Sequence, residues 1–480
     1  MFALVLLLSA GAVVESANLS SLRDPEIWGH LRLGSWILEN RSWPQVGLFS
    51  QAANLPWRDF NWGYDVLTAT AYRLWGLRAI PAFLMGFRVA LAAITFLLAG
   101  GERSFWSAAA LSTVAQYALS TMGPVAPCIS VVFFGIELLL LFEIRKSGNL
   151  RMLFALAALF LFWGNLDIGF VYGIALYVLF LAALGFEKMG RTWNWQWIQR
   201  TDAEIPIGAT ALAGVACLAA TVFSPYGYHA YAAFFTDQID AVNRNLPSYT
   251  AMSFHRPQDY VLLLLTMAAF LSLGIRRSRD LFQICIMVAC GALAFHAERE
   301  NWLVTLPAVA LIGQAIQEKG EEGEEQQGLQ WGRQTFAAGA VAIALVAVTL
   351  AIRVPGKKET LLGKIGENYP VRACDFIHQN RLPSPLFNSY QWGSFLTWYL
   401  PEYLVAIDER RGLYPEKEEV DYFKAMRADI PYQAFPPMRQ ARTLLVDKVG
   451  VMGEALRGVR GFQVAYEDDI SIVLLQEGEE

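Results

Sequence analysis

The chain has little charge for its length. Only 17% of its 480 residues are Asp, Glu, Lys or Arg, whereas about 25% is usual in a soluble protein. Hydrophobic residues make up 55% of the chain, and the mean hydropathy is +0.34. This composition excludes an ordinary soluble protein and indicates a membrane protein.

The chain also lacks an excess of basic residues and has few cysteines. Its formal net charge is −5, and its aromatic residues lie mostly in apolar runs, apart from Lys and Arg. Nucleic acid is therefore excluded as a partner. Four of the five cysteines fall in apolar segments, which leaves Cys374 alone in the polar C-terminal part. The sequence thus contains neither a disulfide framework nor a CxxC metal motif.

What the chain has instead is apolar runs of spanning length. The first, residues 2–17, has no basic region before it and a poor cleavage site after it, so we expect a retained helix rather than a signal peptide. Segment 61–76 holds Asp65 and Arg73 and is too short and polar to cross comfortably. We expect about eleven spans, at residues 2–17, 80–99, 105–121, 125–143, 151–163, 168–186, 205–223, 259–275, 281–296, 300–316 and 335–352.

The loops between these runs predict the orientation. If segment 61–76 does not cross, the basic loops FEIRKSGNLR, EKMGRTWNWQWIQR and IRRSRD fall on one side, which should be the cytoplasm. The N-terminus is then cytoplasmic, and residues 18–79 and the tail after residue 353 lie outside. We predict a transmembrane domain at 1–355 that includes the external loop 18–79, and a soluble extracytoplasmic domain at 360–480.

The external loop and the tail have their own patterns. PEIWGHLRLGSWILE and WGYDVLTATAYRLWG have apolar residues near helical spacing and predict two helices lying in the membrane interface. After residue 360, YPVRACDFIHQN suggests a helix, and the short apolar runs PLF, YLVAI, TLLV and SIVLL alternate with helical stretches around 391–399 and 416–427. A small α/β domain of about 120 residues fits this pattern.

Several motifs, in this order, resemble those of bacterial polytopic membrane proteins of the GT-C glycosyltransferase superfamily. They are DPEIWGHLRLGSWILE, PWRDFNWGYDVL, WGNLDIGFVYGIAL, FSPYGYHAY and AFHAERENWLVTLPAVAL, followed in the tail by NYPVRACDFI, NSYQWGSFLTW and AIDERRGLYPE. The resemblance covers nearly the whole chain. It implies an α-helical polytopic protein of the bacterial cytoplasmic membrane with a C-terminal extracytoplasmic α/β domain. Two positions depart from the pattern: Asp167 stands where a histidine is expected, and Ser224 precedes Pro225 where an asparagine is expected.

The resemblance also implies an activity. Such an enzyme moves a sugar, with inversion, from a polyprenyl-phosphate donor to an extracytoplasmic acceptor. In that superfamily an acidic residue of the first external loop is the usual catalytic group, and Asp24 and Glu26 occupy that place here. The resemblance does not decide whether Asp24 and Glu26 bind a divalent metal, Mg²⁺ or Mn²⁺. Side chains two positions apart on a helix point away from each other, so other loops would have to complete the site.

The residues themselves point to the same chemistry. Transfer to a hydroxyl needs a carboxylate or imidazole near the acceptor proton, and a cation near the departing phosphate. The predicted topology places such groups from four separate parts of the chain on one membrane face. We take His30, Arg32, Asn165, Asp167, His255, Arg256, His296, Arg299 and Asn301 as candidates for binding donor phosphate or substrate, and Asp408 and Arg410 of DERRGLY as candidates for binding an acceptor or anionic group.

The candidate residues also have purely structural interpretations. Asp24 followed by Pro25 is typical of a helix start with aspartate as the N-cap. Glu26 and His30 lie one helical turn apart and would pair, Arg299 would lie in a solvated turn, and DERRGLY would hold a salt bridge. For the whole chain, the alternative is a non-catalytic GT-C-like subunit, a scaffold or a transporter. A transporter needs a polar route through the core, and the predicted spans carry few charges.

The predicted topology can be tested with an impermeant thiol reagent. In a background without the five native cysteines, Arg279→Cys should not react from outside intact cells, because loop IRRSRD is expected in the cytoplasm. Cysteines introduced in residues 18–79 and 353–480 should react under the same conditions. Labelling of position 279 in intact cells would overturn the topology.

Overall fold

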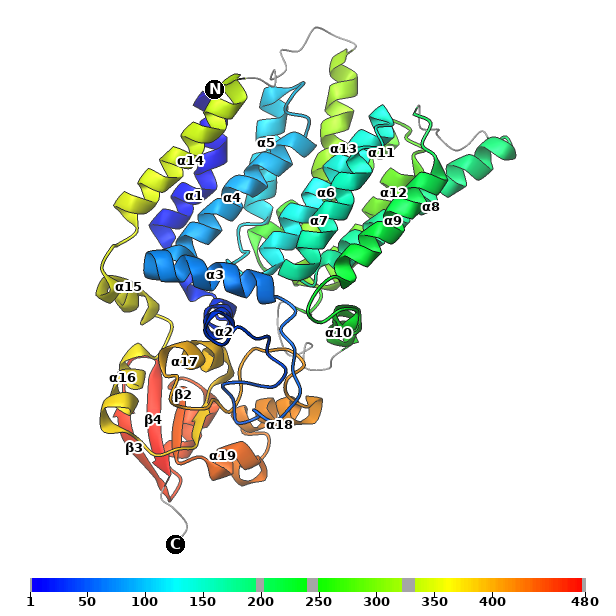
Figure 1. Ribbon diagram of the computed structural model, residues 1–480. Coiled ribbons are helices and arrows are strands. Elements are labelled where there is room, and N and C mark those ends of the chain that lie inside the picture. The colour runs from blue at the N-terminus through cyan, green and yellow to red at the C-terminus, as the bar shows by residue number, and fades with distance from the viewer. Residues whose placement is uncertain (1, 196–202, 240–248, 322–332, 477–480) are drawn as a thin grey trace. The chain divides into compact units, whose positions relative to one another are not determined.

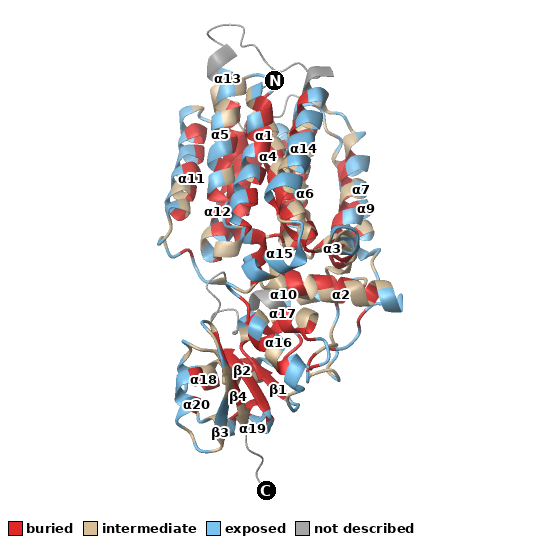
Figure 2. Cartoon of the chain, turned by 90° about the vertical axis from the view of Figure 1, so that its left-hand side faces the viewer, coloured by how far each residue is buried: buried red, intermediate tan, exposed pale blue. Residues whose placement is uncertain are grey.

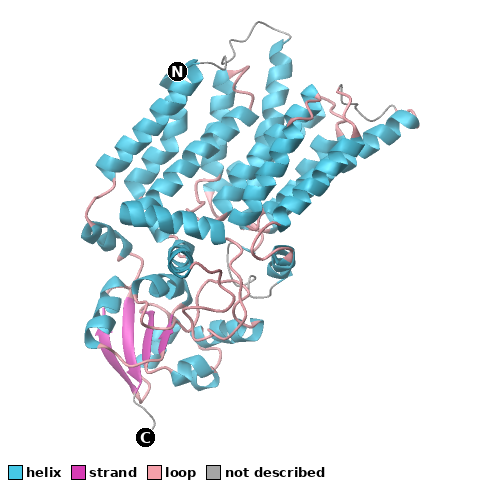
Figure 3. Cartoon of the chain, viewed as in Figure 1, coloured by secondary structure: helices cyan, strands magenta, loops and turns pink. Residues whose placement is uncertain are grey.

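The computed structural model describes residues 2–195, 203–239, 249–321 and 333–476. The chain forms two compact units: unit 1 comprises residues 1–18, 82–234 and 243–353, and unit 2 comprises residues 19–81, 235–242 and 354–480. The described regular structure of unit 1 is helical, and the described strands belong to unit 2 (Figures 1 and 3). The predicted boundaries placed the external loop with the membrane helices, whereas the structure groups residues 19–81 with the C-terminal residues.

Each of the eleven predicted apolar runs forms a helix. Contacts join α7 to α9, α1 to α14, and α13 to both α11 and α12. A further helix, α10 (His229–Ile239), was not predicted. The eleven helices are α1 (Phe2–Asn18), α4 (Ala79–Leu98), α5 (Phe105–Ala118), α6 (Pro127–Ser147), α7 (Met152–Leu166), α8 (Phe170–Thr192), α9 (Ile207–Val222), α11 (Pro257–Ile275), α12 (Leu281–His296), α13 (Asn301–Glu321) and α14 (Arg333–Arg353).

Fewer of these helices have the length and composition of a membrane span. Among the described residues, four candidate spans meet both criteria, or five if one bent pair of helices counts as a single span. The four are Trp62–Leu98, Pro127–Ser147, Phe170–Thr192 and Pro257–Ile275. The eleven predicted segments are therefore confirmed as helices. Eleven crossings of the membrane are not confirmed. Residues 196–200 of the predicted cytoplasmic loop EKMGRTWNWQWIQR lie outside the described residues.

A buried ionic network joins three helices of unit 1. Arg145, in the last turn of α6, donates through Nη2 to Glu187 of α8 at 2.8 Å and to Asp280 at 2.9 Å. Asp280 is the N-cap of α12, where its side chain accepts two backbone N–H groups. All three side chains are buried. Since one guanidinium compensates two buried carboxylates, the network depends on Arg145.

The α/β part of unit 2 holds a four-stranded mixed sheet of order β1–β2–β4–β3. Its strands are β1 (Leu386–Asn388), β2 (Thr443–Asp447), β3 (Phe462–Glu467) and β4 (Ser471–Gln476). β1 pairs parallel to β2, and the other pairings are antiparallel. Figure 2 shows the buried central strands.

The runs PLF, TLLV and SIVLL supply strands β1, β2 and β4, as predicted. YLVAI forms no strand and makes only an isolated bridge, through Val405 to Ser50. The unpredicted β3 is an edge strand whose residues are exposed or half-buried, so its sequence lacks a continuous apolar run. The predicted α/β character of the tail is confirmed by this sheet and the helices around it.

Helices surround this sheet and complete unit 2. In the tail, the expected helices appear as α16 (Val371–Asn380), α17 (Gly393–Tyr399) and α18 (Glu416–Met426), with the short helices α15 (Lys358–Ile365), α19 (Pro436–Gln440) and α20 (Val451–Arg457) besides. In the external loop, the two predicted helices are α2 (Glu26–Asn40) and α3 (Trp62–Trp75), preceded by the 3-10 turn η1 (Ser20–Arg23) and followed by η2 (Gly76–Arg78). Their position in the membrane interface stays a prediction.

Arg145→Met should destabilise unit 1, because it removes the guanidinium that contacts both Glu187 and Asp280. Removing one member of a buried ion pair costs about 3–5 kcal/mol, so the Tm of the purified protein should fall by several degrees. The matched control is Lys146→Met, since Lys146 is exposed on the same turn and its loss should leave the Tm nearly unchanged. Equal Tm values for both variants would show that the network does not stabilise the helices.

Candidate functional site

Helix α2 packs tightly against α17 within unit 2. Trp28 is fully buried, and its ring lies 4.7 Å from that of Trp398 and 5.4 Å from that of Phe395, measured between centroids. A Cβ on Gly29 would lie 3.1 Å from the Ser394 hydroxyl oxygen, so a larger side chain would push the helices apart. This packing fixes the N-terminal end of α2 beside the segment that begins at Ser394.

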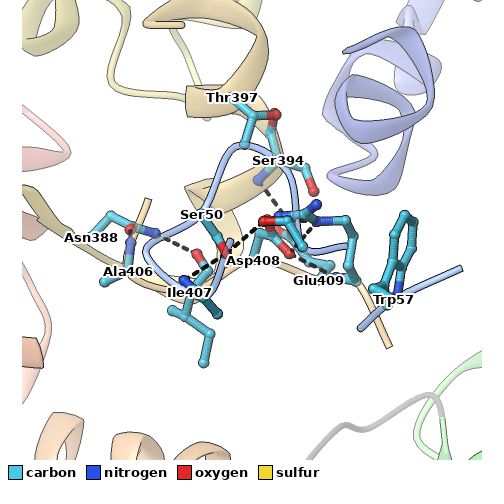
Figure 4. Close-up of polar contacts among 12 residues, drawn as sticks. Ser50, Trp57, Asn388, Ser394, Thr397, Ala406, Ile407, Asp408 and Glu409 are labelled. Carbon is cyan, nitrogen blue, oxygen red and sulfur yellow. Dashed lines mark hydrogen bonds and ion pairs between the residues drawn. The ribbon is translucent and has the colours of Figure 1, made fainter. Parts of the chain in front are cut away.

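The connector between α2 and α3 binds to the same C-terminal segment. Ser50 bridges to Val405, and the N–H of Gln51 donates to the Val405 carbonyl at 2.9 Å. The indole N–H of Trp57 donates to the Arg411 carbonyl at 2.9 Å. Figure 4 shows Ser50 and Trp57 together with residues of the C-terminal segment. These contacts hold the connector against the loop that carries the DERRGLY motif.

Asp24 and Glu26 lie at the start of α2. Asp24 is half-buried, and its Oδ1 accepts the Glu26 N–H at 3.1 Å, which agrees with the predicted capping role. Burial and then the charge of Glu26 raise the pKa of Asp24 to about 7. The Glu26 carboxylate lies 3.6 Å from Nη2 of Arg411. At neutral pH, Asp24 can therefore both accept and release a proton.

A third carboxyl group, Glu409, joins this site from the C-terminal segment. Its carboxylate accepts the Ser394 N–H at 3.0 Å (Figure 4), and burial raises its pKa to about 8. Burial, and then the charges of Asp24 and Glu409, raise the pKa of the Tyr369 phenol, so both carboxyls lie near one ring. We call Asp24, Glu26 and Glu409 the acidic cluster.

His30 belongs to a second group of polar residues. Its Nδ1 lies 2.6 Å from Oδ1 of Asp65 on α3, and Asp65 contacts Asp59 of the connector through the side chains. Asp59 and Asp65 are 4% and 0% exposed. We call Asp59, Asp65 and His30 the buried relay. The predicted pairing of His30 with Glu26 is replaced by a contact with Asp65, because α3 packs alongside α2.

The two aspartates of the buried relay share their environment. Burial, and then the charge of Asp65 and the hydrogen bond to it, raise the pKa of Asp59 well above its usual value. Burial also raises the pKa of Asp65, while the hydrogen bond from Asp59 lowers it. Burial thus favours a proton on this pair, and the hydrogen-bond contributions favour Asp59 as the carboxyl that carries it. The arrangement is two carboxyl groups and an imidazole in series.

The other unit 2 candidates make structural contacts. Arg410 is buried and donates from Nε and Nη2 to both oxygens of Asp408, at 2.7–3.0 Å. Its guanidinium also lies 5.3 Å from the centroid of the Trp57 ring. Arg32 lies 4.4 Å from the centroid of the Phe49 ring. The Asp408–Arg410 geometry is that of the predicted salt bridge. The neighbouring Arg411 lies beside Glu26 at the start of α2, and Glu409 contacts Ser394 of α17.

The WGNLD turn in unit 1 is also held by local contacts. Asp167 is buried; it accepts the Ser130 hydroxyl and, at 2.9 Å, the Gly169 N–H. Asn165 donates to the carbonyls of Leu161 at 2.8 Å and Phe223 at 3.1 Å. These bonds close the turn between α7 and α8 and connect it to the end of α9.

The remaining unit 1 candidates converge on one end of α11 and α12. Nη2 of Arg256 contacts Asp259 at 3.0 Å and Glu298 at 2.5 Å, which joins the loop before α11 to the HAEREN turn. Arg299 contacts Glu300 through Nε at 3.0 Å and the Tyr249 hydroxyl through Nη1. His255 and His296 are exposed, and Asn301 begins α13.

The predicted site residues thus form two sets, one in each unit. Asp24, Glu26, His30, Arg32, Asp408 and Arg410 lie in unit 2, and the other seven lie in unit 1. Among the described residues, no group of three or more His, Cys, Asp or Glu side chains is arranged as a metal site. Asp24 and Glu26 are therefore a poor fit for a resident Mg²⁺ or Mn²⁺, and we assign no step to one.

Sequence reasoning missed Asp59, Asp65 and Glu409 as site residues. Asp65 could have been suspected, because it is a carboxylate among the helically spaced apolar residues of segment 61–76. Glu409 lies within the DERRGLY motif, but a sequence does not show which members of a charged run turn inward. Nothing in the sequence around Asp59 indicated a site residue, since its neighbours are those of an ordinary polar loop.

The chain thus combines a helical unit that contains long apolar helices with a unit that carries a C-terminal α/β part. No family model and no curated protein matches the chain. Its fold is similar to that of the oligosaccharyltransferase of the archaeon Archaeoglobus fulgidus, whose apo form aligns with a TM-score of 0.54 and 14% identity over 92% of this chain and 69% of that chain.

Two further structures of that enzyme align with TM-scores of 0.50. One is AglB in complex with an inhibitory peptide and a dolichol-phosphate, at 13% identity over 92% of this chain and 69% of that chain. The other is a complex with Zn and sulfate, at 12% identity over 92% and 68% of the two chains. At these identities the likeness shows the fold alone, and the expected helical fold with a C-terminal α/β part is confirmed.

Asp59→Asn should make the protein more stable at high pH. The pKa of Asp59 is higher in the folded chain than the unfolded value of about 3.9. Between these two values the folded state binds more protons, so stability falls as pH rises. Asparagine keeps the donor to Asp65 but does not titrate. The Tm of Asp59→Asn minus that of wild type should therefore grow from pH 5 to pH 8.

The control for this experiment is Asp469→Asn, at an exposed position. It should follow the wild-type Tm across the same pH range. If the Asp59→Asn difference were constant with pH, Asp59 would not carry a proton in the folded chain.

Proposed function

We propose that the chain is a glycosyltransferase of the bacterial cytoplasmic membrane, which transfers a sugar with inversion from a polyprenyl-phosphate donor to an extracytoplasmic acceptor. Asp24 is the base that takes the proton of the attacking hydroxyl. The observation that carries this proposal is the acidic cluster at the start of α2. It supports a general base, because burial and Glu26 bring the pKa of Asp24 to about 7, near the pH at which the enzyme would work.

The fold supports the choice of reaction class. The solved structures with a similar fold are oligosaccharyltransferases, and one of them was determined with a dolichol-phosphate. Fold alone does not define chemistry, so the acidic cluster has to supply the chemical argument. In an inverting transfer, the hydroxyl attacks the anomeric carbon while the bond to phosphate breaks, and a base beside the hydroxyl lowers the barrier.

The phosphate leaves with negative charge, and cations near it favour its departure. In unit 2, Arg411 lies 3.6 Å from Glu26 and can serve as such a cation. In unit 1 the sequence-based candidates for binding phosphate are Arg256 and Arg299, together with His255, His296 and Asn301. The proposed partners are the bilayer, the lipid-linked sugar and the acceptor, with the N-terminus in the cytoplasm and the tail outside.

Asp24→Asn and Asp24→Ala separate the catalytic role from the capping role. Asparagine keeps an oxygen that accepts the Glu26 N–H but cannot take up a proton. Asp24→Asn should therefore lower sugar transfer about a hundredfold or more at an unchanged Tm. Asp24→Ala should lose activity and also the cap, which is worth about 1 kcal/mol. Transfer is measured with a polyprenyl-phosphate-linked sugar as donor.

In the wild type, the transfer rate should rise with pH through about 7, because the base must be ionised. Asp469→Asn, at an exposed position, serves as the control and should transfer sugar normally. An active and stable Asp24→Asn variant would remove Asp24 as the base and leave it as a helix cap.

A further inference from the structure

Glu137 is an acidic residue in the middle of an apolar helix. It lies in α6, within the candidate membrane span Pro127–Ser147, and it is fully buried. Neither oxygen of its carboxyl group has a hydrogen-bond partner among the described residues. A carboxyl group is costly to bury in this way, and an ionisable residue inside a membrane span usually has a function. The proposed transfer assigns no task to Glu137.

Unit 1 also contains a buried glutamate that has a cation beside it. Glu187 of α8 is buried and accepts a hydrogen bond from Arg145 at 2.8 Å. That guanidinium supplies the positive charge and the N–H group that a buried carboxylate requires. No Lys, Arg or His side chain among the described residues acts on Glu137 in this way. The surroundings of Glu137 therefore disfavour its ionised form.

The carboxyl group of Glu137 meets an indole ring over a glycine. A Cβ added to Gly173 of α8 would lie 2.6 Å from Oε2 of Glu137 and 2.5 Å from the Trp163 ring, so only glycine leaves both groups this space. The Trp163 N–H donates to the Ser130 hydroxyl at 2.7 Å, and that hydroxyl donates to Asp167. The ring beside Glu137 is thus held by the same contacts as the WGNLD turn.

Two weakly acidic side chains also interact with Glu137. They are the phenol of Tyr177 on α8 and the thiol of Cys217 on α9. The Tyr177 hydroxyl donates to the Thr210 carbonyl at 2.8 Å, so it does not donate to Glu137. Helices α4, α7 and α13 also pack against α6, but no charged or titratable group described on them acts on Glu137. A carboxylate here would have no compensating charge.

We propose that Glu137 is a proton-binding site of unit 1. The folded helices hold it as the neutral carboxylic acid, and loss of the proton weakens the contact of α6 with α7 and α8 at Trp163 and Gly173. The unfolded chain releases this proton at about pH 4.3, whereas the folded chain retains it at higher pH. The folded state then binds more protons, so unit 1 loses stability as pH rises. This inference does not depend on the proposed glycosyl transfer.

Infrared spectroscopy of the full-length protein detects the proton directly. A carboxylic acid has a C=O stretching band that a carboxylate lacks, and the band has a higher frequency when the group makes no hydrogen bond. The spectrum of the wild type minus that of Glu137→Gln at pH 7 should contain one such band. Protonated carboxyl groups that both proteins share cancel in this difference. The matched control, Glu143→Gln, changes a half-buried glutamate on the same helix and should leave the band in place.

Absence of a carboxylic acid band from the difference spectrum of Glu137→Gln would overturn the proposal, because Glu137 would then be ionised. If Glu137→Gln does not fold, Glu137→Leu gives the same comparison, since leucine suits the apolar surroundings.

The link between this proton and stability is measured by the Tm of the purified protein from pH 5 to pH 9. Glutamine has the size of glutamate but does not titrate, so the Tm of Glu137→Gln minus that of the wild type should grow by several degrees across this range. Asp59 and other titrating groups contribute equally to both proteins. The same difference for Glu143→Gln should not change with pH. A constant difference for Glu137→Gln would overturn the proposed switch.

Discussion

The packing of α2 against α17 is the contact on which unit 2 depends. Trp28 fills an aromatic pocket formed by Tyr369, Phe395 and Trp398, and burial of a ring this large contributes roughly 3 kcal/mol or more. Gly29 permits the close approach on the same helix. Because of this contact, a stretch near the N-terminus and a segment some 370 residues later form one compact body.

This constraint explains why Asp24, Glu26 and His30 of RDPEIWGH are half-buried beside other polar residues. A helix start exposed to water would leave Asp24 with an ordinary carboxyl. Docked against the C-terminal segment, Asp24 is partly desolvated and lies near Glu26, and its pKa rises. The same packing of α2, on its other neighbour α3, brings His30 to Asp65. Perturbed carboxyl groups gathered in this way are more frequent at functional sites than elsewhere.

The sequence predicted local structure better than it predicted partners. The apolar runs of unit 1 all became helices, and α2, α3, α16, α17 and α18 lie where periodicity placed them, because helical periodicity depends on residues a few positions apart. Edge strand β3 was missed, since an exposed strand needs no apolar pattern.

Contacts between distant segments followed no local rule. His30 was expected to pair with Glu26, four residues away, but pairs with Asp65, thirty-five residues away. In DERRGLY, the buried pair Asp408–Arg410 and the site residues Glu409 and Arg411 alternate along the chain. The course of the loop determines which of these four residues contacts α2. The connector contacts at Val405 and Trp57 fix that course.

Two carboxyl groups of the acidic cluster titrate near neutral pH. Burial raises the pKa of Asp24 to about 7 and that of Glu409 to about 8, so each can exchange a proton there. The Oε1 atom of Glu409 is buried with no hydrogen-bond partner among the described residues. A protonated Glu409 can donate a hydrogen bond from this oxygen. In the proposed transfer, Asp24 would take the proton of the attacking hydroxyl. A neutral Glu409 would avoid adding a further negative charge beside the departing phosphate.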